Sequence, residues 1–264
     1  MVTITINPKK PAVLIDCSYY IFNRFYATTK WFGFQKKEYD EDEFNKAFFK
    51  HVEADFEKMQ KKLKTDINNI ILCMDCPRAD IWRNDLYESY KATRIQKENF
   101  NSEIFNIFND FIKKTKITQI SFNRLEADDI VYLFHSKIKE LNPKQSIIII
   151  TNDNDYLQLS NNNTKIINMQ FKDICLRGTL NPQIDLLVKI IYGDKGDNIN
   201  KILTGITKEK AIKIALMNDE DRDKFLIENN IIDKYELNKK LIAFENIPKE
   251  YFEKFYDYYN IYIL

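Results

Sequence analysis

The chain has 264 residues, of which 44% are hydrophobic, 14% aromatic and 30% charged, and its formal net charge is +1. This composition excludes a disordered tail and predicts one large folded domain, or one domain with a small appendage. The near-neutral charge gives no support for a surface that is basic throughout, although separate positive and negative faces are compatible with it.

Short apolar runs alternate with amphipathic segments through the first two thirds of the chain. The apolar runs predict strands at 11–16, 69–75, 117–122, 147–151 and 164–169. Apolar residues three and four apart predict helices at 17–27, 41–64, 102–114 and 126–141. This alternation is typical of an α/β fold, in which helices flank both faces of a mostly parallel central sheet.

The remaining segments are less regular. A loop is expected at 31–40, and the polar stretch at 77–100 has weak helical patterning and little that must be buried. Residues 171–178 suggest a short hairpin, and helices follow from 181 onward. We therefore expect an α/β core over 1–180 and a helical region over 181–264 that packs on it.

Acidic residues follow the predicted strands. In a parallel sheet all strand carboxyl ends lie at one edge, where ligands bind. Seven acids are directed there by topology: Asp16, Asp75, Glu126, Asp128, Asp129, Asp153 and Asp155. Each one alone is compatible with a helix cap. Together they repel one another unless a cation compensates, and an all-oxygen site favours Mg²⁺ or Mn²⁺. We therefore predict a divalent-metal centre that holds two ions.

The stretch NDND at 152–155 has other interpretations. An EF-hand loop is excluded, because Leu157 and Gln158 occupy the positions of a required ligand and of the glycine. A haloacid-dehalogenase phosphatase would use Asp153 as its nucleophile, but its nucleophile strand opens the fold, and here the strand is the fourth. A non-catalytic DNA-binding relative with a degenerate site is a third alternative.

Five motifs occur in one order: LIDCSYYIF, MDCPRADIWRNDLYESYKATR, LEADDIV, IIIITNDNDYLQL and IYGDKGDNI. This series resembles the structure-specific 5′-nuclease family, which includes flap endonucleases and the 5′-nuclease domain of bacterial DNA polymerase I. The likeness is greatest to phage members with ribonuclease H activity and continues into the C-terminal helices. It implies a PIN-like fold with a helical arch at about 77–115. The implied enzyme is a Mg²⁺-dependent 5′-3′ exonuclease and flap endonuclease that removes RNA primers in replication.

The resemblance also implies roles for individual acids. A first metal position would use Asp16, Asp75 and Asp128, with Glu126 close by. A second would use Asp153, Asp155 and Asp197, with Asp194 and Asp129 farther from the ion. Two Mg²⁺ ions, replaceable by Mn²⁺, would activate water and stabilise the developing charge. No protein nucleophile is implied.

Nucleic-acid contacts follow from the same resemblance. Arg83, Lys91 and Arg94 lie in the arch stretch, where Lys91 and Arg94 would draw the scissile phosphate onto the metals. Residues 198–217 are similar to the family's helix–hairpin–helix, which holds duplex phosphates and often K⁺; the implied contacts are Gly205, Lys208, Lys210 and Lys213. Thr207 replaces the hairpin's second glycine, which disfavours K⁺.

The expected partners are DNA and RNA–DNA duplexes with 5′ ends or flaps, and a replication single-strand-binding protein. The N-terminus has no signal-peptide pattern, and no apolar run approaches the ~20 residues of a membrane helix. We therefore expect a monomeric protein of the cytoplasm, the host's if the chain is viral, without a membrane partner.

Overall fold

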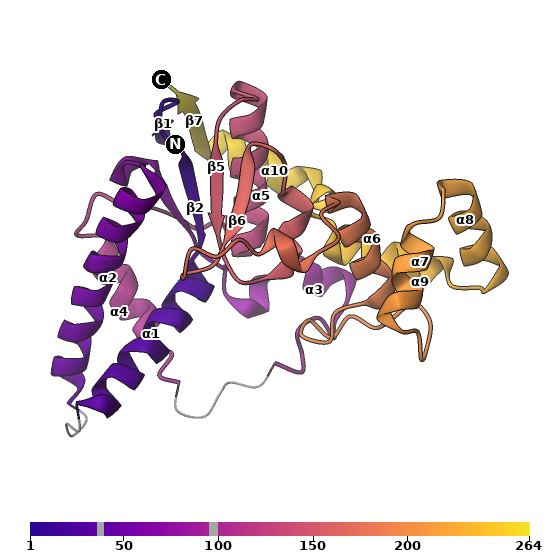
Figure 1. Cartoon of the computed structure of the whole chain (residues 1–264), viewed down its shortest axis with the longest axis horizontal. Helices are drawn as coiled ribbons and strands as arrows, with labels where there is room; N and C mark the ends of the chain where they lie inside the picture. The colour runs from indigo at the N-terminus through magenta and orange to yellow at the C-terminus, as the bar shows by residue number, and fades with distance from the viewer. Residues whose placement is uncertain (36–39, 95–99) are drawn as a thin grey trace.

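A five-stranded parallel sheet forms the centre of the computed structural model, which describes residues 1–35, 40–94 and 100–264 (Figure 1). The order of its strands is β4-β3-β2-β5-β6, and all neighbours are parallel. Their bounds are Ala12–Asp16 (β2), Ile70–Cys73 (β3), Thr118–Ile120 (β4), Ile147–Ile150 (β5) and Thr164–Ile167 (β6). The central mostly parallel sheet predicted from the sequence is confirmed.

Alternating side chains of β2, β3 and β5 enter two different apolar cores. In β2, Leu14 packs with one cluster, whereas Val13 and Ile15 pack with the other. Both faces of the sheet are therefore buried, which is why these strands are continuous apolar runs. The first cluster is covered by α5 (Ala127–Leu141) and α10 (Lys249–Tyr258), and the second by α1 (Cys17–Phe34), α2 (Glu41–Leu63) and α4 (Ile104–Ile112).

Two local predictions are wrong. Helix α1 continues to Phe34 instead of ending at 27, because Phe32 is buried against α2. The predicted loop is therefore helical over 31–34, and residues 36–39 lie outside the described part. The polar stretch at 77–100 also buries more than expected: Ile81, Trp82 and Tyr90 are core residues around the short helix α3 (Arg83–Leu86). Residues 95–99 of the predicted arch are likewise outside the described part.

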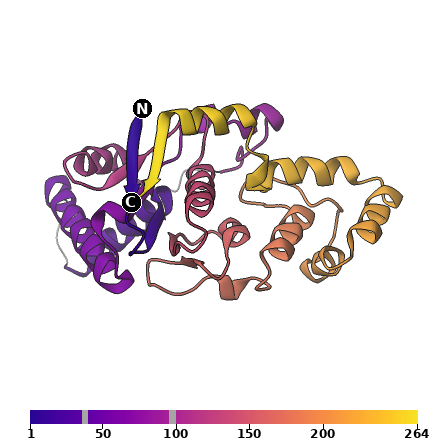
Figure 2. The same ribbon diagram turned by 90° about the horizontal axis from the view of Figure 1, so that it is seen from above.

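The two ends of the chain form a second sheet that the sequence did not predict. Strand β1 (Val2–Ile6) pairs in parallel with β7 (Tyr259–Ile263), which follows α10 directly. Figure 2 shows the two strands side by side. The end of the chain was expected to be helical, and its pairing with the other terminus depends on a contact that no local pattern reports. The hairpin expected at 171–178 reduces to a single bridge between Ile167 and Asp173.

Four of the helices after 181 share a third apolar core. They are α6 (Pro182–Tyr192), α7 (Lys208–Ala215), α8 (Asp219–Glu228) and α9 (Ile232–Ile242). Their buried residues include Ile191, Ile214 and Leu241. Phe255 of α10, by contrast, packs with the sheet. The division at 180 remains a prediction.

Short 3₁₀ turns complete the described fold, at Ile67–Asn69, Arg78–Asp80, Asn154–Leu159, Cys175–Arg177 and Phe244–Asn246. None of the helices in the described ranges combines the length and the apolar character that a membrane crossing would require.

Candidate metal centre

The carboxyl edge of the sheet gathers the acids at its topological switch point. The chain passes from β2 to β3 and β4 on one side, and then returns to β5 on the other side of β2. Asp16 is the last residue of β2, Asp75 lies just beyond β3 and Asp153 just beyond β5. Ligands of open α/β sheets bind at this point, so topology alone brings these three carboxylates together.

Four of the acids, Asp16, Asp75, Asp128 and Asp153, are here called the open acids. Within the described ranges none of them has a Lys, Arg or His at ion-pair distance. Their hydrogen bonds come from neutral groups instead. Asp16 accepts from Tyr19 N (3.1 Å) and Thr151 Oγ1 (2.9 Å), and Asp75 accepts from Ala127 N (2.8 Å) and the Ser18 hydroxyl. These bonds orient the carboxylates without neutralising them.

Two of the open acids, Asp16 and Asp128, have pKa values above the ordinary range of a carboxyl group. Burial, together with the negative charge of Asp75, raises the pKa of Asp16 to about 7. Burial also raises the pKa of Asp128 well above its usual range; Asp129 and Glu126 add to the effect, while Arg83 opposes it. A carboxylate in this situation binds either a proton or a cation.

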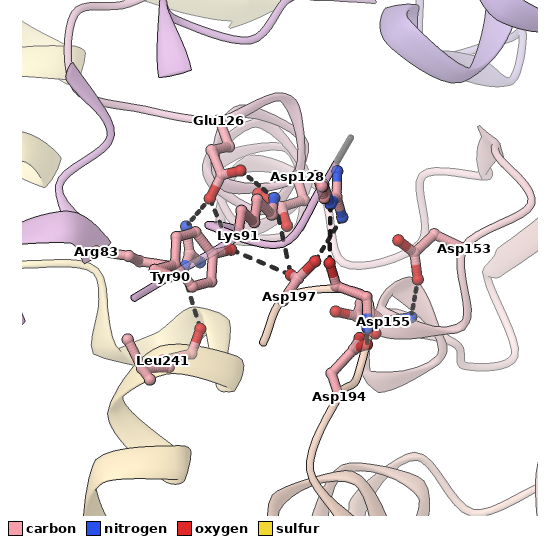
Figure 3. Close-up of polar contacts among 12 residues, drawn as sticks. Arg83, Tyr90, Lys91, Glu126, Asp128, Asp153, Asp155, Asp194, Asp197 and Leu241 are labelled. Carbon is pink, nitrogen blue, oxygen red and sulfur yellow. Dashed lines mark hydrogen bonds and ion pairs between the residues drawn. The ribbon is translucent and has the colours of Figure 1, made fainter. Parts of the chain in front are cut away.

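Glu126, Asp129, Asp155, Asp194 and Asp197 are here called the paired acids, because a protein cation contacts each of them. Arg83 lies at the centre of the first pairing and is only 1% exposed. Its Nη1 donates to Glu126 Oε2 at 2.9 Å and its Nε donates to Leu241 O (Figure 3). Its Nη2 donates to Asp129 Oδ1 at 2.7 Å. This guanidinium therefore joins α5 to the end of α9.

Asp129 is saturated by protein donors. Its Oδ2 accepts from Trp82 Nε1 at 3.0 Å, Arg83 Nη1 at 2.8 Å and Glu126 N at 3.0 Å. The last bond is half of the capping box that starts α5. In this structure Asp129 holds the start of α5 and Arg83 in place. A role of Asp129 as a metal ligand remains a prediction.

A second pairing joins the polar stretch to the GDKGDN loop. Lys91 contacts Glu126, and its Nζ lies 3.7 Å from Asp197 Oδ2, while Arg94 contacts Asp197 Oδ1. Tyr90 Oη lies 2.9 Å from Glu126 Oε2 and 3.2 Å from Asp197 Oδ2 (Figure 3). Attraction to Lys91 and Arg83 outweighs burial and lowers the pKa of Glu126.

The third pairing uses Lys189 of α6. Its ammonium contacts Asp155 Oδ1 and lies 2.8 Å from Asp194 Oδ2. The loop that carries Asp194 requires glycine at its start: Gly193 has φ +73°, and a Cβ there would meet Ile199 O at 2.4 Å. Attraction to Lys189 prevails over burial and lowers the pKa of Asp194.

The donor set fits divalent ions of the magnesium type. Carboxylate oxygens of Glu126, Asp128 and Asp129 lie within 4.8 Å of one another, as do those of Asp155, Asp194 and Asp197. Asp155 Oδ1 is buried, and the Lys189 ammonium contacts it. Asp16, Asp153 and Asp194 line one cleft of about 420 Å³. A donor set of hard carboxylate oxygens, several of them without a protein cation, suits Mg²⁺ or Mn²⁺.

The predicted acids gather at one edge of the sheet, whereas one predicted phosphate contact faces the protein interior. All nitrogens of Arg83 donate to buried protein acceptors, and a contact of this residue with nucleic acid stays a prediction. Sequence reasoning also missed Lys189 and Tyr90. A single lysine inside the apolar run LLVKIIY was the available signal for Lys189.

The predicted hairpin contacts lie on the surface. Gly205 is exposed with φ +74°, and Lys208, Lys210 and Lys213 are exposed on α7. Thr207 caps α7 with ordinary extended backbone (φ −85°), and its Oγ1 accepts from Lys210 N. The left-handed backbone that a glycine would permit is therefore not needed at this position.

Comparisons with known proteins identify relatives. The chain is 26% identical to a ribonuclease H of Enterobacteria phage T4 over 85% of this chain and 81% of that protein. It is 27% identical to a 5′-3′ exonuclease of Mycoplasmopsis pulmonis, over 86% and 74%.

The fold is shared with solved structures. A phage T5 5′-exonuclease with bound divalent zinc ions superposes with a TM-score of 0.65 at 16% identity, over 97% of both chains. A T5 flap endonuclease complexed with DNA and metal ions gives 0.63 at 15% identity, over 97% of both chains. A family model described as the 5′-3′ exonuclease N-terminal, resolvase-like domain matches residues 11–183, well over half of the sequence. The chain thus belongs to this 5′-3′ exonuclease family.

Proposed function

We propose that this nuclease is Mg²⁺-dependent and hydrolyses phosphodiester bonds near the 5′ ends and flaps of DNA and RNA–DNA duplexes. Removal of RNA primers in replication is the role that this specificity serves. The observation that carries the proposal is the set of open acids at the switch point, together with Lys91 and Arg94, which contact the paired acids Glu126 and Asp197. Four carboxylates without a counter-charge create a strong demand for divalent cations.

Two groups of residues would hold the ions. Asp16, Asp75 and Asp128 form one group, with Glu126 beside it; Asp153, Asp155, Asp194 and Asp197 form the other. When bound, the ions would lower the pKa of an attacking water and stabilise the charge that develops on the phosphate. The chain's own contribution is orientation: Thr151 and the Tyr19 amide hold Asp16, while Ser18 and the Ala127 amide hold Asp75.

Lys91 and Arg94 are proposed to bind the scissile phosphate. Both reach the acidic edge from the polar stretch, and the Arg94 side chain is 50% exposed, so its guanidinium is accessible to a ligand. Arginine and lysine supply most phosphate contacts of proteins that bind nucleic acids. Their present partners, Glu126 and Asp197, keep both cations at the centre.

The duplex is proposed to lie along the helical region. A cleft of about 820 Å³ is lined by Lys201, Lys234 and Gly205 among others, and the exposed lysines of α7 follow it in the chain. Lys201 Nζ donates to Ile206 O at 2.9 Å inside the hairpin. Because an ammonium group already serves this carbonyl, we propose that duplex binding does not require K⁺. The enzyme is proposed to act as a cytoplasmic monomer, with a single-strand-binding protein as its partner.

The phosphatase alternative has less support. It needs Asp153 as an unencumbered nucleophile, whereas Asp153 Oδ1 accepts from Asp155 N at 3.0 Å and caps the following 3₁₀ turn. It also gives no role to Asp75, Asp128 and Asp197. A non-catalytic relative would have no use for so many mutually repelling carboxylates.

Cleavage of a flapped duplex labelled at its 5′ end tests the proposal. With Mg²⁺, wild type should release the flap or short 5′ products, and Asp153→Asn and Asp155→Asn should each lose at least about 100-fold in rate. Asp257→Asn, on an exposed position of α10, is the matched control and should cleave normally. Absence of any 5′ product from wild type would overturn the nuclease proposal. Full cleavage by both site variants would instead overturn the site assignment.

A further inference from the structure

Lys189 is a half-buried cation in a position where the proposed reaction would place a metal. Its side chain is only 19% exposed, and it is the one charged residue of the run LLVKIIY at the end of α6. The ammonium contacts Asp155 from the turn after β5 and Asp194 from the loop after α6. It thereby joins two segments that are far apart in sequence.

The geometry of this contact is fixed by the end of the helix. Gly193 N donates to Lys189 O at 2.8 Å, and the left-handed Gly193 then turns the chain so that Asp194 faces back towards α6. Asp194 is in turn held by Gly196 N, which donates to its Oδ1 at 2.6 Å. Lys189 therefore accepts the last hydrogen bond of α6 with its carbonyl and pairs with Asp194 through its side chain.

Lys189 and a divalent ion would use the same oxygens. Asp155, Asp194 and Asp197 each offer a carboxylate oxygen within a 4.8 Å group, and the ammonium contacts two of these three side chains. A cation that binds both Asp155 Oδ1 and Asp194 Oδ2 must first displace the ammonium. The open acids present no such competitor, since no cation of the described segments is paired with them.

We propose that Lys189 is a tethered counter-ion that holds Asp155 and Asp194 together before metal binds and weakens their affinity for the second divalent ion. This inference rests on the two-ion centre of the proposed function. Lys189 is thus a positioning residue, and it makes the two halves of the centre unequal. The first ion binds at Asp16, Asp75 and Asp128, where no protein cation is paired, and the second binds more weakly because it has to compete with the Lys189 ammonium.

Mn²⁺ binding to the full chain without substrate tests the inference. Free Mn²⁺ is measured by electron paramagnetic resonance during titration of wild type, Lys189→Met and Lys195→Met. Lys195 carries the same charge in the loop between Asp194 and Asp197 but is exposed, so Lys195→Met is a control for net charge. Lys189→Met should bind the second Mn²⁺ roughly tenfold more tightly, as expected for removal of a partly buried ion pair. Lys195→Met should stay within about twofold of wild type.

A second variant and a second measurement distinguish a change in metal affinity from misfolding of Lys189→Met. Lys189→Gln removes the charge but keeps a donor, and should also tighten the second site. In EDTA both neutral variants should melt below wild type, because Asp155 and Asp194 then repel each other, and Mn²⁺ should raise their melting temperatures more than that of wild type. Unchanged or weaker binding of the second ion in both Lys189 variants would overturn the inference and leave the proposed function standing. Failure of wild type to bind any Mn²⁺ would overturn both.

Discussion

The open acids and the paired acids lie at one centre but are held in different ways. The open acids follow β2, β3 and β5 or begin α5, and backbone amides and hydroxyls orient them. The paired acids contact Arg83, Lys91, Arg94 and Lys189, which come from the polar stretch and from α6. The open acids therefore need a cation from solution to balance their charge, whereas lysine and arginine side chains of the protein balance the charge of the paired acids.

The two groups of acids therefore affect the stability of the fold in different ways when a counter-charge is missing. Without metal, Asp16 and Asp128 hold a proton more tightly than an ordinary carboxyl group, and their ionisation destabilises the fold. Paired carboxylates do not need a metal to balance their charge. Removal of either partner of a pair destabilises the fold, because the remaining buried charge is then unpaired. Substitutions that exchange the two situations test the comparison.

The largest effect is expected from Arg83→Met. This change removes the buried guanidinium and leaves Glu126 and Asp129 to repel each other, so it turns paired acids into open ones. The loss of a partner from a buried ion pair costs about 3–5 kcal/mol of unfolding free energy. Urea denaturation followed by circular dichroism in EDTA measures this.

Arg124→Met is the control for Arg83→Met. The partner of Arg124, Asp85, has a side chain that is 63% exposed, so the loss should stay below about 1 kcal/mol. If both variants lost similar stability, the guanidinium of Arg83 would not be the support that its contacts indicate.

The next largest effect is a dependence of the unfolding free energy on pH that is caused by Asp16. Its pKa is about 7 in the folded protein against an ordinary value of 3.8, so the folded state binds this proton more tightly than the unfolded chain does. The resulting stability is fully present below about pH 4 and is lost as pH rises through about 7. In EDTA, Asp16→Asn should therefore be more stable than wild type at pH 8, by on the order of 2–4 kcal/mol.

At pH 4 the same comparison should give nearly equal stabilities, because Asp16 is then protonated in the folded protein. Urea denaturation at both pH values, with metal chelated, provides the measurement. Asn keeps an oxygen for the Tyr19 amide, so the helix cap is preserved in the variant. A constant difference between pH 4 and pH 8 would show that burial of Asp16 does not shift its titration.

The open acids were predictable from sequence, whereas the pairing of Arg83 and Lys189 with buried acids was not. Asp16, Asp75 and Asp153 follow apolar runs, and the rule that parallel strands end at one edge converts their positions into proximity. Arg83 looked like a surface charge because its partners, Glu126, Asp129 and Leu241, are distant in sequence. No periodicity in a short polar stretch reports a contact with the end of α9.

The same physical limit applies to the fold. Strands β2, β3 and β5 were found because each is a buried apolar run bounded by turns. Strands β4 and β6 contain polar residues and lie inside the longer predicted runs at 117–122 and 164–169. The sheet of β1 and β7 was missed because it joins the chain termini, and closure of so long a loop has no local signature. Helix α1 was predicted too short, since Phe32 depends on packing against Phe44 and not on residues beside it.

A smaller effect is expected from Lys91→Met. Lys91 adopts a left-handed backbone (φ +54°) that directs it to the paired acids, and its amide donates to Asp197 O at 2.9 Å. Loss of its charge should lower the cleavage rate of a flapped duplex by roughly 10- to 100-fold if the ammonium binds the scissile phosphate. Single-turnover rates at saturating Mg²⁺ separate this loss from weaker binding. A rate within twofold of wild type would assign Lys91 to structure alone.

The smallest stability effect is expected from Arg94→Gln. Arg94 pairs with Asp197, but its side chain is 50% exposed, and solvent screens an ion pair of this kind. We expect a loss of at most about 1 kcal/mol in urea denaturation, far below that of Arg83→Met. Its activity on the flapped duplex should fall more than its stability, because an accessible guanidinium can transfer from Asp197 to a phosphate. A large loss of stability with normal cleavage would place Arg94 with Arg83 as a structural cation, and the distinction between buried and accessible partners of the paired acids would fail.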